Sequence, residues 1–189
     1  MGLIKELLSQ KPKEQTVFTL SDLSLLVGYN GPKLRSALKY ATGKGDLRRM
    51  AKGIYVLDTQ YSRLEFGNKF RLPSYISFYS ILAGNGVVFQ PYTSVYIASR
   101  RSEMVVIDAQ KYIYRKIKDE ILLNPLGINI SNGISVASVE RAICDKLYLD
   151  GDEYFDNLRT VNFELMIKLN EIVYGNNKTI KQFIGKNVK

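Results

Sequence analysis

The first 57 residues place apolar side chains at helical spacing in three successive segments, and this pattern limits the possible folds more than any other feature. The third segment is the most regular, with one apolar stripe formed by Leu34, Ala37, Leu38 and Ala41. Pro32 occupies a first helical position, where proline is tolerated. Two earlier stripes predict helices over 3–10 and 20–27, the second with a capping box formed by Thr19 and Asp22. A glycine-containing turn at 28–31 then joins the second helix to the third.

A basic β-hairpin is predicted directly after the third helix. Two short strand-like runs occupy 46–50 and 53–57, and the segment carries Arg48, Arg49 and Lys52. A helix, a helix–turn–helix and a hairpin follow one another in the order of a winged helix. We therefore expect a winged helix-turn-helix domain over residues 1–70.

Residues 71–189 have a different pattern, which predicts a mixed α/β domain ending in helices. Strand-like runs occupy 94–99, 104–107 and 111–117, and the segment 128–134 adds one or two more strands. Helices are predicted over 75–83, from an N-cap at Ser138 through Leu149, over 156–175 and over 178–184. The fold class expected for the whole chain is α+β.

The residue counts exclude several kinds of chemistry. The chain has no histidine, so it cannot build a Ser-His-Asp or Cys-His nucleophile. With Cys144 as its one cysteine it also lacks the ligands of a Cys/His zinc site and cannot form an internal disulfide, which fits a reducing, cytoplasmic setting. Cys144 lies among apolar helix positions, so we interpret it as a small core residue in preference to a redox sensor.

The net charge is +9, which favours a polyanionic partner such as nucleic acid or an anionic membrane. Residues 1–72 hold 13 of the 27 basic residues and 6 of the 18 acidic ones, so most of the excess lies in the first third. The stretch 72–99 has no formally charged residue, but Pro73, the 84–86 turn and Pro91 interrupt it. We therefore expect no membrane span, and the N-terminal residues do not resemble a signal peptide.

The third helix has the composition of a helix that reads DNA. An α-helix fits the major groove, where polar side chains near its N-terminus reach base edges and flanking cations hold phosphates. The residues expected to contact DNA come from the helix and the hairpin: Asn30, Lys33, Arg35, Ser36, Lys39, Arg48, Arg49 and Lys52. For the helix alone, a solvated polar face is an equally good interpretation, and Tyr29 and Tyr40 are expected to pack. The turn, the hairpin and the local positive charge together favour DNA.

No arrangement of residues predicts catalysis, a cofactor or a metal site. Glu140, Arg141 and Asp145 form the best candidate cluster of the second domain. Glu140 and Asp145 could act as an acid–base pair, but five residues apart on a helix they point in different directions, so a helix N-terminus salt-bridged to neighbouring strands is the simpler interpretation. The acidic turn 150–153 lacks the later ligands of an EF-hand, so we expect a loop that favours the N-terminus of the following helix. The chain also lacks the P-loop spacing and any D/E-x-K triplet.

Several segments resemble one protein family. In the first domain these are 18–23 (FTLSDL), 33–38 (KLRSAL), 44–49 (KGDLRR) and 53–55 (GIY). In the second they are 73–77 (PSYIS), followed by Gly86, and 135–147 (SVASVERAICDKL). In this order the segments are similar to the AbiE-type antitoxins of bacterial type IV toxin–antitoxin systems, and they extend over most of the chain.

The resemblance implies a two-domain regulator without catalytic residues. Its winged helix would bind inverted repeats in double-stranded promoter DNA and repress its own operon. Its second domain would counteract a nucleotidyltransferase-like toxin, which in type IV systems does not require a stable protein complex.

Two other classes of function stay open. One is a transcriptional regulator in which the second domain senses a small ligand. The other is a nucleic-acid-processing enzyme that uses carboxylates. A nucleotidyltransferase gene beside this one would favour the antitoxin, an apolar pocket with convergent polar groups would favour the sensor, and metal-dependent cleavage would favour the enzyme.

Overall fold

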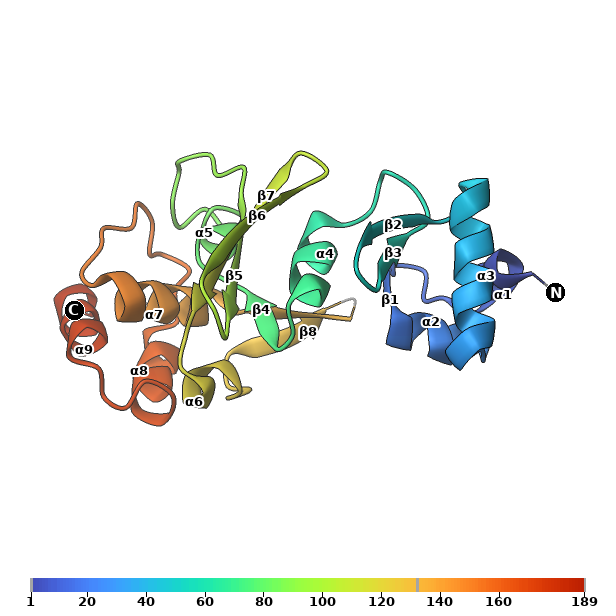
Figure 1. Ribbon diagram of the computed structural model, residues 1–189. Coiled ribbons are helices and arrows are strands. Elements are labelled where there is room, and N and C mark those ends of the chain that lie inside the picture. Colours follow the sequence, from blue (N-terminus) through green and yellow to red (C-terminus); the bar gives the residue numbers. More distant parts are fainter. Residues whose placement is uncertain (1, 132, 189) are drawn as a thin grey trace. The chain divides into compact units, whose positions relative to one another are not determined.

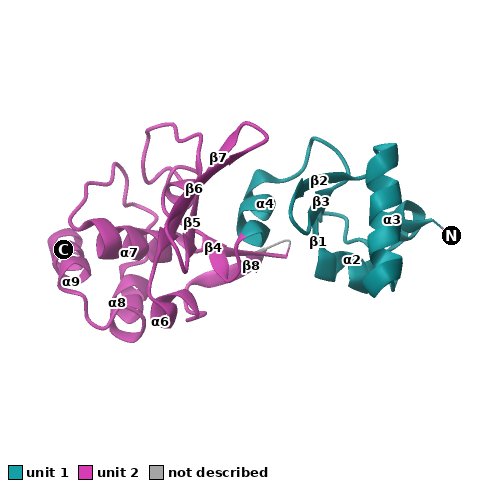
Figure 2. Cartoon of the chain, viewed as in Figure 1, with its two compact units in different colours: residues 1–70 teal, residues 71–189 magenta. Residues whose placement is uncertain are grey.

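The chain divides into two compact units, Met1–Phe70 and Arg71–Lys189, in a computed structural model that describes residues 2–131 and 133–188 (Figure 2). Both units combine helices with a β-sheet, which confirms the expected α+β class.

The first unit alternates helices with a three-stranded antiparallel sheet (Figure 1). Its elements are α1 (Leu3–Gln10), β1 (Val17–Thr19), α2 (Leu20–Val27), α3 (Gly31–Lys44), β2 (Arg48–Ala51), β3 (Ile54–Val56) and α4 (Arg63–Phe70). The strand order is β1-β3-β2, so β3 lies in the middle. The predicted helices and hairpin of this unit are confirmed to within a few residues.

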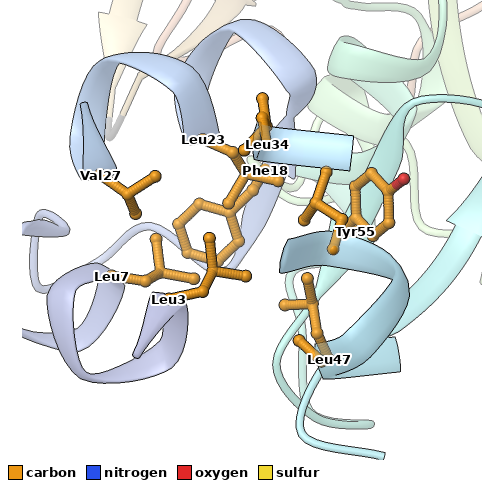
Figure 3. Close-up of a cluster of buried hydrophobic side chains, with 10 residues drawn as sticks. Leu3, Leu7, Phe18, Leu23, Val27, Leu34, Leu47 and Tyr55 are labelled. Carbon is orange, nitrogen blue, oxygen red and sulfur yellow. The ribbon is translucent and has the colours of Figure 1, made fainter. Parts of the chain in front are cut away.

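One apolar core joins α1, α2, α3 and the small sheet. Leu7, Phe18 and Leu23 are fully buried, and Figure 3 shows their side chains gathered with those of Leu3, Val27, Leu34, Leu47 and Tyr55. The predicted stripe on α3 supplies Leu34, Leu38 and Ala41 to this core, while Ala37 is partly buried. Because this stripe is buried, the opposite side of α3 faces outward.

Local signals in the sequence fix the ends of α2 and α3. The predicted capping box is confirmed, since Thr19 Oγ1 accepts from the backbone N–H of Asp22 at 3.1 Å and Asp22 Oδ2 accepts from the N–H of Thr19 at 3.0 Å. Gly28 ends α2 and Gly45 ends α3 with φ of 65° and 80°, a conformation that favours glycine.

Helix α4 was not predicted, because its buried face is largely polar. Glu65 is 2% exposed and accepts hydrogen bonds from the backbone N–H groups of Thr16 and Val17 at 2.9 and 3.1 Å. Lys69 forms an ion pair with Glu65 at 2.9 Å. Lys69 also donates to the carbonyl of Val17 at 2.8 Å, so polar bonds hold α4 against β1 without the apolar stripe that reveals a helix in a sequence.

The second unit contains a six-stranded mixed sheet in the order β6-β7-β5-β4-β9-β8. Its elements are β4 (Ser74–Ile76), α5 (Tyr79–Leu82), β5 (Val95–Ser99), β6 (Glu103–Ile107), β7 (Gln110–Lys116), α6 (Asp119–Leu122), β8 (Ile128–Ser131), β9 (Ile134–Ala137), α7 (Val139–Asp150), α8 (Phe163–Ile172) and α9 (Lys178–Asn187). The β5–β7 and β4–β9 pairs are parallel, and the other pairs are antiparallel. The predicted strands, the Ser138 cap and the helical C-terminal part are confirmed.

Two predicted helices of this unit are wrong in extent. The segment 75–83 begins as the buried strand β4 and becomes helical only at Tyr79, because a short apolar run without clear periodicity fits a central strand equally well. The helix predicted over 156–175 begins only at Phe163, where Asn162 Oδ1 accepts from the N–H of Leu165 at 3.0 Å. Helix α6 was not predicted.

Candidate nucleic-acid interface

Helix α3 presents a polar face to solvent on the side opposite its buried stripe. Arg35, Ser36 and Lys39 are exposed, and at 100° per residue they point to the same outward side. Asn30 is also exposed, and its side chain makes no capping hydrogen bond to α3. The side chains of these four residues are therefore available to an external partner.

Lys33 lies on a different flank of α3 from Arg35. Its Nζ is 3.9 Å from the centre of the Tyr29 ring, a cation–π contact at the edge of the core. Lys44, which was not among the predicted contacts, lies 4.8 Å from the Tyr40 ring, and its hydrogen bond with Tyr40 raises the pKa of Lys44. Tyr40 is 65% exposed, so the expectation that it packs in the core is wrong, whereas Tyr29 does pack against the core.

The β2–β3 hairpin brings its three predicted cations into unequal environments. Arg49 and Lys52 are exposed, whereas Arg48 is half-buried. The pairing of β2 with β3 shifts register between Arg49 and Ala51, where Arg49 Nε donates to the carbonyl of Ala51 at 3.4 Å. Gly53 takes φ of 78° at the turn. Arg49 and Lys52 are thus better placed than Arg48 to reach a ligand.

The exposed cations of this surface are not neutralised within the unit. Residues 1–70 contain twelve Lys and Arg and six Asp and Glu. Lys69 pairs with Asp22 and Glu65, but Arg35, Lys39 and Lys52 form no ion pair with any residue that the structure describes. Unpaired cations on one exposed helix face and its neighbouring hairpin can bind phosphate groups without first breaking internal salt bridges.

The carboxylate pair considered as an acid–base site is part of the protein core. Asp145 is fully buried and accepts hydrogen bonds from the hydroxyls of Tyr75, Ser77 and Tyr174 at 3.0, 2.7 and 2.7 Å. Burial raises the pKa of Asp145, and the neighbouring Arg141 opposes that shift. Glu140 instead accepts from the N–H of Asn162 at 3.0 Å. The structure therefore separates Glu140 from Asp145 and encloses Asp145.

Arg141 is also fully buried, and it connects Asp145 to the surrounding backbone. Its guanidinium donates to the carbonyl groups of Leu126 and Ile121 at 2.6 Å each. An ion pair is present in this part of α7, with Arg141 Nε 3.7 Å from Asp145 Oδ1, but it belongs to a buried polar network and does not bridge to a neighbouring strand as expected. No pattern in the sequence predicts that Tyr75, Ser77 and Tyr174 contact Asp145, because they lie 29 to 70 residues from it.

The acidic turn after α7 pairs with cations, contrary to the expectation that it favours the next helix N-terminus. Asp150 accepts from Arg115 at 2.6 Å and pairs with Lys146 at 2.7 Å. Hydrogen bonding to Arg115 is the main reason that the pKa of Asp150 falls to about 2. Asp152 and Glu153 pair with lysines at 2.7 Å each, those partners being Lys186 and Lys146.

The described residues also show the environment of Cys144 and the arrangement of possible metal ligands. Cys144 is fully buried, and burial raises the pKa of its thiol well above the usual value, so its interpretation as a core residue is confirmed. No three His, Cys, Asp or Glu side chains of the described chain come together as metal ligands. Within the same residues, no helix has the length and apolar character needed to cross a membrane.

Comparison of the chain with models of known protein families and with curated protein sequences finds no match.

Proposed function

We propose that this protein is a DNA-binding autorepressor and antitoxin of a type IV toxin–antitoxin operon, with residues 1–70 as its winged-helix DNA-binding domain and residues 71–189 as its antitoxin domain. Double-stranded promoter DNA is the ligand of the first unit. A nucleotidyltransferase-like toxin is the functional target of the second.

One observation carries the DNA-binding half of the proposal. The outward face of α3 and the adjacent hairpin expose Arg35, Ser36, Lys39, Arg49 and Lys52, and the cations among them have no acidic partner in the unit. The order of elements, from α1 through β1, α2 and α3 to the β2–β3 hairpin, supports the proposed winged helix. In such domains the second helix of the helix–turn–helix enters the major groove.

A promoter–reporter assay tests repression in cells. The gene's own upstream region drives the reporter, and the wild-type chain is expected to lower its expression. Arg35→Ala with Lys39→Ala should relieve repression, because it removes two cations from the outward face of α3. The control is Lys5→Ala with Lys13→Ala, which removes the same charge from exposed positions outside α3 and the hairpin. Equal repression by both double variants would contradict the proposal.

The antitoxin half rests on the resemblance of segments 73–77 and 135–147 to the AbiE-type family. Co-expression of the chain with its genomic neighbour, scored by growth, tests this half. We expect the chain to restore growth, and we expect Arg35→Ala with Lys39→Ala to restore it equally well, since these residues belong to the DNA-binding unit. Growth arrest that the wild-type chain does not relieve would contradict the antitoxin role.

A ligand-sensing winged-helix regulator is the second candidate. A cavity of about 470 Å³ in the second unit, lined by both aromatic and polar residues, is the observation that favours it. A reporter response to a small molecule, combined with no effect on growth in the co-expression experiment, would favour the sensor over the antitoxin.

A further inference from the structure

The cavity of the second unit lies between two irregular segments, 87–92 and 152–156, beside α5. Its wall includes four aromatic side chains and two carboxylates: Tyr79, Phe89, Tyr92, Tyr154, Glu153 and Asp156. Phe89 is 70% exposed and Tyr154 is 81% exposed. These two large aromatic side chains, one from each segment, leave apolar surface that a bound group would cover.

The aromatic part of the wall has a fixed geometry. The rings of Tyr79 and Tyr92 stack with their centres 4.0 Å apart and their planes 7° apart, and Tyr96 meets both rings edge-on. Two bonds tie the segments on either side of the cavity together. The N–H of Phe89 donates to Asp156 Oδ2 at 2.8 Å, and the N–H of Asn157 donates to the carbonyl of Val87 at 3.2 Å. The cavity is therefore formed before any ligand arrives.

The charged residues around the cavity favour a ligand with a positive charge. The stretch 72–99, which supplies one wall, has no charged residue, and 150–156 contains four acidic residues and no basic one. Lys146 has its Nζ 4.7 Å from the centre of the Tyr79 ring and is paired with Asp150 and Glu153. Of the two carboxylates that line the cavity, Glu153 is paired with Lys146, so a phosphate or another anion would meet the unpaired charge of Asp156.

Of the two carboxylates that line the cavity, Asp156 is the one that forms no ion pair with the residues that the structure describes. Asp150, Asp152 and Glu153 are all in ion pairs, whereas Asp156 forms none with the residues that the structure describes. It is exposed and lies on the cavity wall, where its carboxylate can accept further hydrogen bonds.

We propose that this cavity binds an arginine side chain of a partner protein. A guanidinium is a planar cation that stacks on aromatic faces while its N–H groups donate to a carboxylate, and this wall offers both kinds of group. A free arginine would bring an α-carboxylate and an α-ammonium, whereas an arginine within a polypeptide presents its guanidinium alone, so we take the polypeptide residue as the occupant. This inference goes beyond the proposed function and does not depend on DNA binding.

The test is an NMR titration of the full chain with an otherwise uncharged glycine–serine peptide that carries one arginine. We expect saturable shifts of the backbone amides in 87–92 and 152–157, with a Kd of about 1 mM or tighter. The same peptide with citrulline, which keeps the shape of arginine without its charge, should give no saturable shifts. Equal binding of the citrulline peptide, or no binding of the arginine peptide, would overturn the proposal.

Two variants and their matched controls locate the site. Asp156→Asn keeps an oxygen for the N–H of Phe89 but removes the charge, and Tyr154→Ala removes an exposed ring. Each should weaken binding of the arginine peptide about tenfold. Glu164→Gln and Tyr40→Ala change an exposed acid and an exposed tyrosine elsewhere and should have no effect. Unchanged affinity in Asp156→Asn, or free arginine binding as tightly as the peptide, would contradict the assignment.

Discussion

The buried carboxylate of Asp145 connects three parts of the second unit. Its hydrogen bonds come from Tyr75 in β4, from Ser77 just after β4 and from Tyr174 after α8, while Asp145 itself lies in α7. Arg141, one helical turn earlier, places its Nε 3.7 Å from Asp145 Oδ1. A polar network with this many partners fixes how α7 packs on the sheet.

We predict that Asp145→Ala lowers the free energy of unfolding by about 3–5 kcal/mol, because it leaves Arg141 buried without its partner. Tyr174→Phe, which removes a single hydrogen bond to that carboxyl, should cost about 1–3 kcal/mol. Urea denaturation measures both changes. Tyr154→Phe is the control, since this hydroxyl is exposed, and a loss below about 1 kcal/mol in Asp145→Ala would refute the role given to the network.

Asp150 makes a pH-dependent contribution to stability. Its pKa in the folded chain is about 2, below the ordinary value of 3.8, chiefly because Arg115 donates hydrogen bonds to it. The ionised carboxylate therefore stabilises the fold above about pH 4, and this contribution is lost as the pH falls towards 2. We predict a steeper loss of stability between these values in the wild type than in Asp150→Asn, measured by urea denaturation at a series of pH values. Parallel curves would contradict this assignment.

At the scale of elements, the β2–β3 hairpin and α3 have different expected roles. Arg49 and Lys52 are exposed on a hairpin that, in the proposed function, contacts phosphates and not base edges. Arg49→Ala with Lys52→Ala should therefore weaken binding to the upstream DNA and to random DNA by the same factor. It should also reduce the slope of log affinity against log salt concentration by about 2. An unchanged slope would contradict the expectation that the hairpin contacts DNA phosphates.

Helices and strands were predicted correctly where the sequence carries a clear local pattern, such as an apolar stripe, a helix cap or alternating apolar residues. The stripe and flanking glycines of α3, the Ser138 cap of α7 and the alternating strands β5 to β7 are all present. Helix α4 and strand β4 were missed, because Glu65 and Asn68 are buried in the first and a short apolar run forms the second.

For the candidate site, the apolar stripe predicted which side of α3 is exposed. Burial of Arg48 and the partners of Asp145 depend on tertiary contacts that no local pattern contains.

At the scale of the whole molecule, the two units carry different chemistry. The first unit has a basic surface on which Arg35, Lys39 and Lys52 form no ion pair with the described residues, and the second has a buried polar network and an aromatic cavity with two carboxylates. We propose that one unit binds DNA and the other has the antitoxin activity. This proposal predicts that a variant can lose DNA binding and keep antitoxin activity, or the reverse.

Affinity of the purified full chain for the DNA upstream of its gene, measured by fluorescence anisotropy, tests the central claim most directly. The wild type should bind this DNA more tightly than a scrambled sequence. Arg35→Ala with Lys39→Ala should weaken specific binding about tenfold to hundredfold, while Lys5→Ala with Lys13→Ala leaves it nearly unchanged. Equal affinity of the wild type for upstream and scrambled DNA, or undiminished binding by the α3 variant, would contradict the account.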